Sequence, residues 1–245
     1  MPHEFEVREE ITLDATPEQV WQAIATGPGV DSWFMGHSEF EPRAGGATSF
    51  DMFSEIESGR VTAWEPGKRF AYRSDEKNGE FMAFEYLLEA RDGGSTVLRF
   101  VHNGFLGDDG WADQYDALKV GDRKYLEKLA AYVKHFEGRT AVHSLFLPGP
   151  RVEASRAWPA LASAFALTNP EEGDRAHPQV GPSDAEGTVT HADETGCLIV
   201  ATPDALYTLM LGMGAVFIQV HNFNPSHQAA DIDTAWQSWL EKTFA

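Results

Sequence analysis

The chain has 245 residues, of which 42% are hydrophobic and 23% are charged, and its formal net charge at pH 7 is −19. A surface this acidic repels phosphate backbones and anionic lipid headgroups, because affinity for nucleic acids comes largely from Lys and Arg side chains. We therefore expect no nucleic-acid partner and no membrane partner. The composition is that of a globular protein with a buried core, and the longest apolar runs fall far short of the roughly 20 residues of a membrane span.

The N-terminus and the cysteine content favour a cytoplasmic location. The first residues contain neither the basic nor the apolar region of a secretory signal. Cys197 is the single cysteine, which excludes an internal disulfide and suits a reducing compartment. It lies within an apolar strand pattern without a basic neighbour, so we expect a buried structural thiol, not a nucleophile.

The first elements are a strand and a helix. Residues 4–13 alternate between apolar and polar side chains, which predicts a half-buried strand. A helix start follows at Thr16-Pro17-Glu18, where Thr16 is the expected N-cap and Pro17 the first helical residue. Thr26-Gly27-Pro28-Gly29 predicts the end of this helix, and a second short helical turn is expected at residues 30–34.

Strand signals then follow one another up to residue 102. The candidates are 37–42, 46–53, 59–65, 68–74, 80–90 and 95–102, separated by turns such as Glu65-Pro66-Gly67 and Lys77-Asn78-Gly79. Short strands at this spacing favour an antiparallel meander, because parallel strands need helical crossovers. One long amphipathic helix is expected at about 110–136. Many strands followed by a long helix indicate an α+β fold.

The second half of the chain repeats this plan in a shorter form. An apolar segment at 142–147 precedes a helix at about 152–167, an exposed loop at 168–186, strands at 187–193, 196–202, 205–211 and 215–222, and a helix at about 228–244. Residues 201–207 echo the helix start at 15–21, but Thr202-Pro203-Asp204 also suits a hairpin turn, which we favour. We expect four large side chains of these helices to be largely buried: Trp158, Phe165, Trp236 and Trp239.

One internal similarity links the two halves. Phe100-Val101-His102-Asn103-Gly104-Phe105 before the long helix is matched by Gln219-Val220-His221-Asn222-Phe223 before the final helix. A strand, a His-Asn pair and a terminal helix in the same order indicate related units. We therefore expect one domain at 1–138 and a diverged, truncated copy of it at 141–245.

Several segments of the first half together resemble one protein family. They are Ala15-Thr16-Pro17-Glu18-Gln19-Val20-Trp21, Gly29-Val30-Asp31-Ser32-Trp33-Phe34, Gly59-Arg60-Val61-Thr62-Ala63-Trp64-Glu65-Pro66-Gly67-Lys68-Arg69 and Val101-His102-Asn103-Gly104-Phe105. Over about residues 4–137 the chain resembles the SRPBCC (START-like, birch-pollen-allergen-like) superfamily, and within it the bacterial homologues of the activator of the heat-shock-protein-ninety ATPase. The resemblance implies a helix-grip fold, in which a curved antiparallel sheet wraps a long C-terminal helix. It also implies an apolar cavity between them. The second half lacks the early strands of this pattern, so it resembles a partial helix-grip.

No sequence motif points strongly to catalysis. There is no phosphate-binding glycine loop, no His-Glu-x-x-His and no Gly-x-Ser-x-Gly. We therefore name no catalytic residue, no metal ligand and no cofactor. Three scattered histidines, His37, His102 and His135, do not make a metal site. His37 could line the mouth of the cavity, although a solvated loop histidine is favoured.

His102 is the most informative single residue. It shares a strand face with Leu98 and Phe100, so it would be a polar group in an apolar wall. The favoured interpretation is that it pins the end of its strand to the following loop, with a ligand contact second and a general acid or base least favoured. With this strand and the aromatic positions of the other elements, the expected ligand contacts are Trp33, Phe34, Phe53, Trp64, Phe84, Tyr86, Leu98, Phe100, His102, Trp111 and Tyr115.

Three functions remain open. The favoured one is non-catalytic binding of a small apolar or aromatic ligand in the cavity. The second, which the resemblance implies, is a chaperone-associated protein that modulates an ATPase in the stress response. The third is an enzyme of the cyclase, dehydratase or hydrolase kind, which the superfamily also contains. A deep closed pocket would favour the first, an exposed apolar patch the second, and a histidine–carboxylate pair inside the pocket the third.

Overall fold

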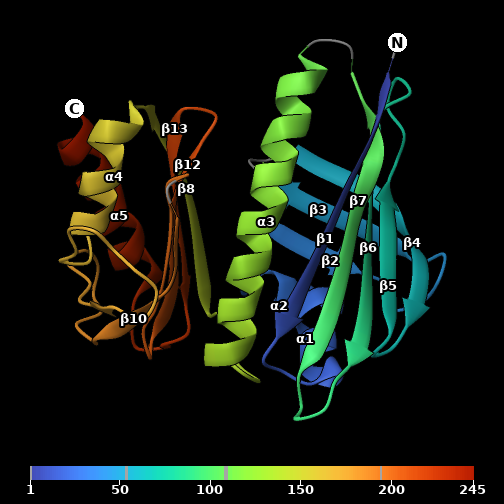
Figure 1. The fold of residues 1–245 in the computed structure, drawn as a ribbon, viewed down its shortest axis with the longest axis horizontal. Coiled ribbons are helices and arrows are strands. Elements are labelled where there is room, and N and C mark those ends of the chain that lie inside the picture. Colours follow the sequence, from blue (N-terminus) through green and yellow to red (C-terminus); the bar gives the residue numbers. More distant parts are fainter. Residues whose placement is uncertain (1, 53–54, 108–109, 194) are drawn as a thin grey trace. The chain divides into compact units, whose positions relative to one another are not determined.

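The protein is described by a computed structural model that covers residues 2–52, 55–107, 110–193 and 195–245. By its internal contacts the chain divides into two units, Met1–Gly138 and Arg139–Ala245. Each unit contains one antiparallel sheet with helices of its own (Figure 1). The α+β class expected from the sequence is therefore confirmed.

The elements of the first unit follow the predicted order. They are β1 (His3–Leu13), α1 (Pro17–Ala25), α2 (Gly27–Val30), β2 (His37–Phe40), β3 (Ala47–Met52), β4 (Glu55–Glu65), β5 (Arg69–Ser74), β6 (Phe81–Ala90), β7 (Thr96–Leu106) and α3 (Trp111–His135).

The first sheet places the first strand beside the last. β1 pairs with β7 along its whole length, and the sheet order is β1-β7-β6-β5-β4-β3-β2, with every pair antiparallel. α3 follows β7 and lies along one face of the sheet, where it contacts β1 and α1 (Figure 1). This is the helix-grip arrangement that the resemblance implied.

Local capping fixes the two short helices. The Thr16 hydroxyl accepts the backbone N–H of Gln19, and the Gln19 side chain accepts the backbone N–H of Thr16, which completes a capping box at α1. The expected second helical turn begins earlier than predicted, at Gly27 instead of Val30. The reason is that the Thr26 hydroxyl accepts the N–H of Gly29, so the segment that ends α1 also caps α2.

The strand alternation of β7 divides its side chains between the two faces of the sheet. Leu98, Phe100 and His102 are buried on the face toward α3. Arg99 points to the opposite face, where its guanidinium pairs with Glu10 at 2.8 Å and Glu89 at 2.9 Å. β7 also runs four residues beyond its predicted end at 102, to Leu106.

The second unit contains a shorter set of elements. They are β8 (His143–Arg151), α4 (Ala154–Ser163), β9 (Arg175–Ala176), β10 (Gly187–Asp193), β11 (Cys197–Ala201), β12 (Ala205–Gly212), β13 (Ala215–Asn222) and α5 (Ala229–Phe244).

The second sheet follows the same winding as the first with one strand fewer. Its order is β8-β13-β12-β11-β10-β9, so its first strand again lies beside its last. A counterpart of the first strand is thus present. The strands that are fewer than in the first unit are those after α4, where β9 has only two residues. The favoured hairpin is also present: the Thr202 hydroxyl accepts the N–H groups of Asp204 and Ala205 between β11 and β12.

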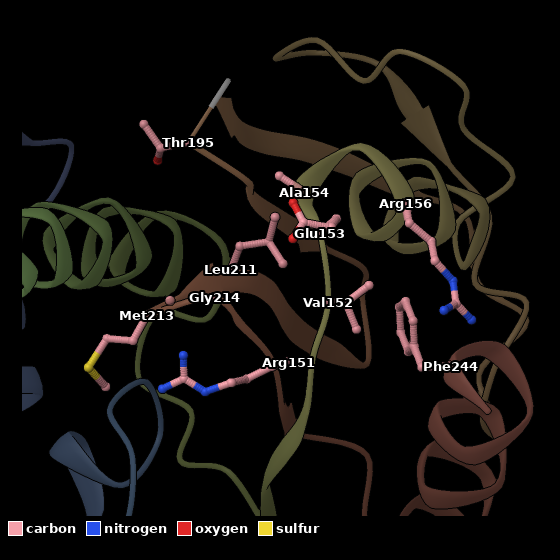
Figure 2. Close-up of a pocket in the computed structure, with 11 residues that line it drawn as sticks. Arg151, Val152, Glu153, Ala154, Arg156, Thr195, Leu211, Met213, Gly214 and Phe244 are labelled. Carbon is pink, nitrogen blue, oxygen red and sulfur yellow. The ribbon is translucent and has the colours of Figure 1, made fainter.

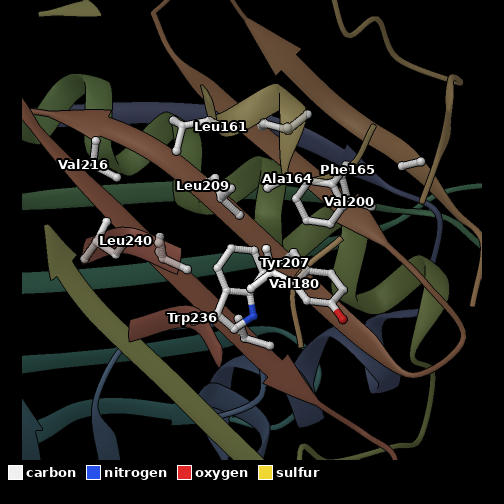
Figure 3. Close-up of a cluster of buried hydrophobic side chains, with 14 of the residues drawn as sticks. Leu161, Ala164, Phe165, Val180, Val200, Tyr207, Leu209, Val216, Trp236 and Leu240 are labelled. Carbon is white, nitrogen blue, oxygen red and sulfur yellow. The ribbon is translucent and has the colours of Figure 1, made fainter. Parts of the chain in front are cut away.

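The space between the second sheet and its helices is filled by side chains. Trp236 of α5, Phe165 after α4 and Tyr207 of β12 lie against one another in this core (Figure 3). Phe165 and Trp236 are fully buried as expected, whereas Trp158 and Trp239 are only partly buried at its edge.

Two predictions for the second unit need correction. α4 ends at Ser163, four residues before the predicted end, and Ala166 has a left-handed φ of +57°, which is incompatible with a continuing α-helix. The segment 168–186 is not a fully exposed loop. Ala176 and Val180 join the buried core, and Arg175–Ala176 form β9. Within the described ranges, no helix is both long and apolar enough to cross a membrane.

Candidate functional site

Two rows of aromatic rings cover the face of the first sheet that points toward α3. One row joins Tyr72 on β5, Phe84 on β6 and His102 on β7, which are direct cross-strand partners. The ring centroids of Tyr72 and Phe84 are 4.9 Å apart, and those of Phe84 and His102 are 4.2 Å apart. The second row, on the same three strands, consists of Phe70, Tyr86 and Phe100. Cross-strand partners point to the same face, so these six rings form one surface, the aromatic wall.

His102 is the polar member of this wall. Its side chain is 2% exposed, with the Phe84 ring stacked on one face and the edge of Phe5 at a centroid distance of 5.0 Å. The imidazole Nδ1 lies 2.9 Å from Oδ2 of Asp122 on α3. The hydrogen bond therefore joins the last strand of the sheet to the long helix, between residues that are 20 positions apart in sequence.

The Asp122 carboxylate determines what the other imidazole nitrogen can do. A carboxylate only accepts hydrogen bonds, so the proton of a neutral His102 lies on Nδ1. Nε2 then carries a lone pair and is an acceptor. This atom is buried, and no described residue gives it a hydrogen-bond partner. The arrangement resembles the base and orienting carboxylate of a catalytic triad, but no described hydroxyl or thiol bonds to Nε2 as a nucleophile would.

A second polar feature of the wall is a pair of tyrosines, Tyr72 on β5 and Tyr86 on the neighbouring strand β6. Burial raises the pKa of Tyr72 above its ordinary value, and the charge of Glu57 adds to this effect. Burial also raises the pKa of Tyr86, with further contributions from Tyr72 and Asp122. Both phenols therefore stay neutral near pH 7.

The two halves of α3 cover the sheet differently. In the C-terminal half, Leu129 and Val133 are buried, whereas none of residues 111–123 is. Asp122 thus lies where the tightly packed half of the helix begins. The N-terminal half is held at its side by Arg123, whose Nη1 lies 3.4 Å from the Glu9 carboxylate on β1.

Trp111 and Tyr115 lie at the N-terminal end of α3, beside the aromatic wall. Trp111 stacks on His3 with centroids 4.6 Å apart, and the Tyr115 hydroxyl donates to the backbone carbonyl of Glu6. Both residues pack against the buried cluster of Phe5, Val7 and Leu106, and the Tyr115 ring lies 6.4 Å from that of Phe5, centroid to centroid. Phe5 in turn contacts His102, so Tyr115 reaches the wall through one intervening ring.

The remaining predicted contacts fall into two groups. The Trp64 ring packs edge-on against Phe70 of the wall, with ring centroids 5.5 Å apart. Leu98 is buried and lies two residues before Phe100 on β7. Trp33 is instead a core residue whose indole N–H donates to the Ala23 carbonyl of α1. Phe34 packs against the Tyr125 ring of α3 at 4.6 Å. Phe53 lies outside the described residues.

His37 forms a separate pair outside the aromatic wall. Its Nδ1 lies 2.6 Å from Oδ2 of Asp31, and the other oxygen of Asp31 accepts the Ser38 N–H. The hydrogen bond to Asp31 raises the pKa of His37, and the charge of Asp31 contributes further. The side chain is 64% exposed, as favoured for a solvated histidine, but it begins β2 and does not belong to a loop.

Sequence reasoning missed Phe70, Tyr72 and Asp122. Tyr72 follows Phe70 by two residues in an alternating strand, so the period-two pattern assigns both to one face. Asp122 falls on the apolar stripe of the long helix, seven residues after Tyr115 and four after Leu118. A carboxylate on the buried stripe of an amphipathic helix was the signal that could have found it.

The second unit has a surface pocket of a different kind. A hollow of about 730 Å³ lies at the start of α4, the β12–β13 turn and the end of α5 (Figure 2). Arg151, Arg156 and Glu153 line it beside Leu211 and Phe244. The three charged side chains are exposed to solvent, where ion pairs contribute little. We therefore assign no ligand to this hollow. No cluster of three or more His, Cys, Asp or Glu side chains suited to a metal ion occurs among the residues described.

Comparison with known proteins shows that the first unit is similar to one family. Residues 14–134 match the family model described as Activator of Hsp90 ATPase homolog 1-like protein. No curated protein sequence matches the chain significantly.

Three solved structures illustrate what the chain is similar to. The protein MLL2253 from Mesorhizobium loti is 24% identical, with a TM-score of 0.47 over 54% of this chain and 99% of that one. The Aha1 dimer from Colwellia psychrerythraea is 18% identical, with a TM-score of 0.43 over 53% of this chain and 96% of that one. The di-domain ARO/CYC protein BexL from the BE-7585A biosynthetic pathway is 14% identical, with a TM-score of 0.48 over 97% of this chain and 94% of that one. At these identities and TM-scores, none of the three indicates what this chain binds.

Proposed function

We propose that the first unit, whose residues 14–134 match the family model of activator of Hsp90 ATPase homolog 1-like proteins, binds a small, largely aromatic molecule. The ligand would lie between the aromatic wall and α3. In this proposal the rings on β5, β6 and β7 form one side of the site. The N-terminal half of α3 forms the other.

The observation that carries this proposal is the aromatic wall itself. Six rings follow one another across three strands, with centroid distances of 4.2 Å to 6.1 Å between direct cross-strand neighbours. A core with only a structural role needs apolar volume and gains little from a buried imidazole and two phenols, of which Tyr86 is buried and Tyr72 half-buried. An aromatic surface with a few positioned polar groups is instead typical of small-molecule sites. The half-buried N-terminal half of α3 provides the side at which a ligand could enter.

Naphthalene is a suitable first probe because it matches an aromatic wall and carries no polar group. We expect it to quench tryptophan fluorescence and to raise the melting temperature by mass action. A ligand present at about 100 times its Kd stabilises the folded state by about 2.7 kcal/mol. Phe100→Leu should weaken this binding while keeping most of the buried volume. Val120→Leu is the matched control, because Val120 is 48% exposed on α3. Equal affinities in both variants would contradict the proposed location.

A chaperone-associated role in the stress response is the second candidate, because the family description names the Hsp90 ATPase. The test is the ATPase rate of Hsp90 with and without the protein. A rate increase that persists in Phe100→Leu would favour this role over ligand binding. We also propose that the protein works in the reducing cytoplasm, since Cys197, its single cysteine, is buried and reduced.

We further propose that the second unit is a diverged, partial copy of the first. The common winding of the two sheets supports this, as does the His-Asn pair in the last strand of each unit. The fully packed space between its sheet and helices supports a structural role for this unit, without a second ligand site of the same kind.

A further inference from the structure

We infer that the ligand of the first unit carries a hydroxyl group on its aromatic skeleton, as a phenol does, and that this hydroxyl donates a hydrogen bond to Nε2 of His102. The inference rests on the proposed function and specifies the chemical class of the ligand. It concerns one atom of one residue, so it can fail while the proposed binding of aromatic molecules stands.

The hydrogen bond between His102 and Asp122 has a defined direction. Asp122 accepts the Nδ1 proton of His102 at 2.9 Å, which leaves Nε2 as an acceptor in the neutral imidazole. Nε2 is buried and has no hydrogen-bond partner among the described residues. Buried acceptors of this kind are rare in folded proteins, and a group that satisfies one must bring a donor. A hydroxyl does so without adding charge.

The surroundings of that acceptor are aromatic. Three aromatic rings lie near the His102 imidazole, with centroid distances of 4.2 Å for Phe84, 5.0 Å for Phe5 and 6.3 Å for Phe100. A ligand that reaches Nε2 must therefore present apolar, preferably aromatic, surface next to its donor. A carboxylate or phosphate would lose its hydration among these rings and would approach the Asp122 carboxylate, so an anionic ligand is disfavoured.

A single donor on the ligand suffices. Among the described residues, the hydroxyls of Tyr72 and Tyr86, the other polar groups of the aromatic wall, do not belong to the buried side-chain atoms that lack a hydrogen-bond partner, whereas His102 Nε2 does. Recognition thus reduces to an aromatic body and one hydroxyl. This is the composition of a phenol or naphthol.

Three probes of nearly the same shape test this inference: 2-naphthol, naphthalene and 2-methoxynaphthalene. Only 2-naphthol can donate a hydrogen bond, whereas the methyl ether has the oxygen but no donor. We expect 2-naphthol to bind about tenfold or more tightly than either of the others, by isothermal titration of the full chain, because satisfying a buried acceptor is worth at least a factor of this order.

Variants then assign the preference to one atom. His102→Phe should keep the affinity for naphthalene and lose the preference for 2-naphthol, because the aromatic surface remains and the acceptor does not. His37→Phe is the matched control and should retain the preference, since His37 is exposed and pairs with Asp31. Asp122→Asn should reduce the preference, because an amide can donate as well as accept and no longer fixes the proton on Nδ1.

The outcomes separate the two proposals. If none of the three probes binds, both the proposed function and this inference fail. If all three bind equally, or if the preference for 2-naphthol survives in His102→Phe, the inference fails and the proposed function stands. The comparison of the three probes on the unmodified protein decides the matter even if a variant does not fold.

Discussion

His102 shows how one side chain can be well placed and still incompletely satisfied. The imidazole is stacked on Phe84, and its Nδ1 hydrogen-bonds to Asp122, but its buried Nε2 has no partner among the described side chains and backbone groups. Leaving a buried polar atom unsatisfied costs about 1–3 kcal/mol. A phenylalanine would fill the same place without this cost, so the structural account of His102 explains the Nδ1 bond but not the choice of residue.

His37 provides a pH-dependent prediction at the scale of a residue. Asp31 raises its pKa, so the folded protein holds the imidazolium more tightly than the unfolded chain does. This contribution to stability is fully present below the unfolded pKa of about 6.5 and is lost as the pH rises through the higher folded pKa. We expect the ring-proton shift of His37, followed by NMR, to titrate above 6.5. Asp31→Asn should lower the pKa of His37 toward the ordinary value, with Glu39 still raising it, and an unchanged titration in that variant would contradict the assignment.

At the scale of an element, α3 combines a helical scaffold with one local weakness. Gly121 lies in the middle of the helix, immediately before Asp122, and glycine is a poor helix former because it loses the most backbone freedom on folding. A Cβ added at this position would meet no atom within 4 Å. Close packing therefore does not require a glycine at this position.

We expect Gly121→Ala to raise the free energy of unfolding by about 0.5–1 kcal/mol, through the lower entropy of the unfolded chain. Urea denaturation followed by circular dichroism measures this change. Gly104→Ala on β7 is the contrasting variant, because its Cβ would collide with the backbone carbonyl of Phe81, and it should destabilise the fold. A loss of stability in Gly121→Ala would show that this turn of the helix needs glycine for another reason.

At the scale of the whole molecule, each unit contains what a folded domain requires. The strands of the first unit pair with one another in a seven-stranded sheet. The second unit has a six-stranded sheet over its own hydrophobic core. The division after Gly138 separates them without cutting a strand or a helix.

We therefore expect a fragment of residues 1–138 to fold alone. Its near-ultraviolet circular dichroism should show fixed aromatic side chains, and its thermal unfolding should be a single cooperative transition. Naphthalene should bind the fragment as it binds the full chain. A fragment with native-like far-ultraviolet but no near-ultraviolet signal would mean that the first unit depends on the second for its packing.

The sequence by itself determined the elements and the faces of this protein. Alternation along β7 placed Leu98, Phe100 and His102 on one face, and turn residues separated the strands, because both depend on neighbours within a few positions. The family resemblance extended this to the helix-grip order of the first unit. Local rules failed at Gly27–Val30, where the side chain of Thr26 caps a second helix, and at Arg175–Ala176, where a two-residue strand is too short to leave a pattern.

Only the tertiary structure decided which polar groups meet. The distance between His102 and Asp122 depends on the rotation of α3 over the sheet, and the position of Tyr72 beside Phe84 depends on the register of β5 against β6. The packing of whole elements sets both the helix rotation and the strand register. Shifting the register by one residue, or turning the helix by one residue, moves a side chain to another face. For that reason the alternating pattern predicted a histidine in an apolar wall, whereas the carboxylate that makes it a directed hydrogen-bond acceptor became visible only in the folded chain.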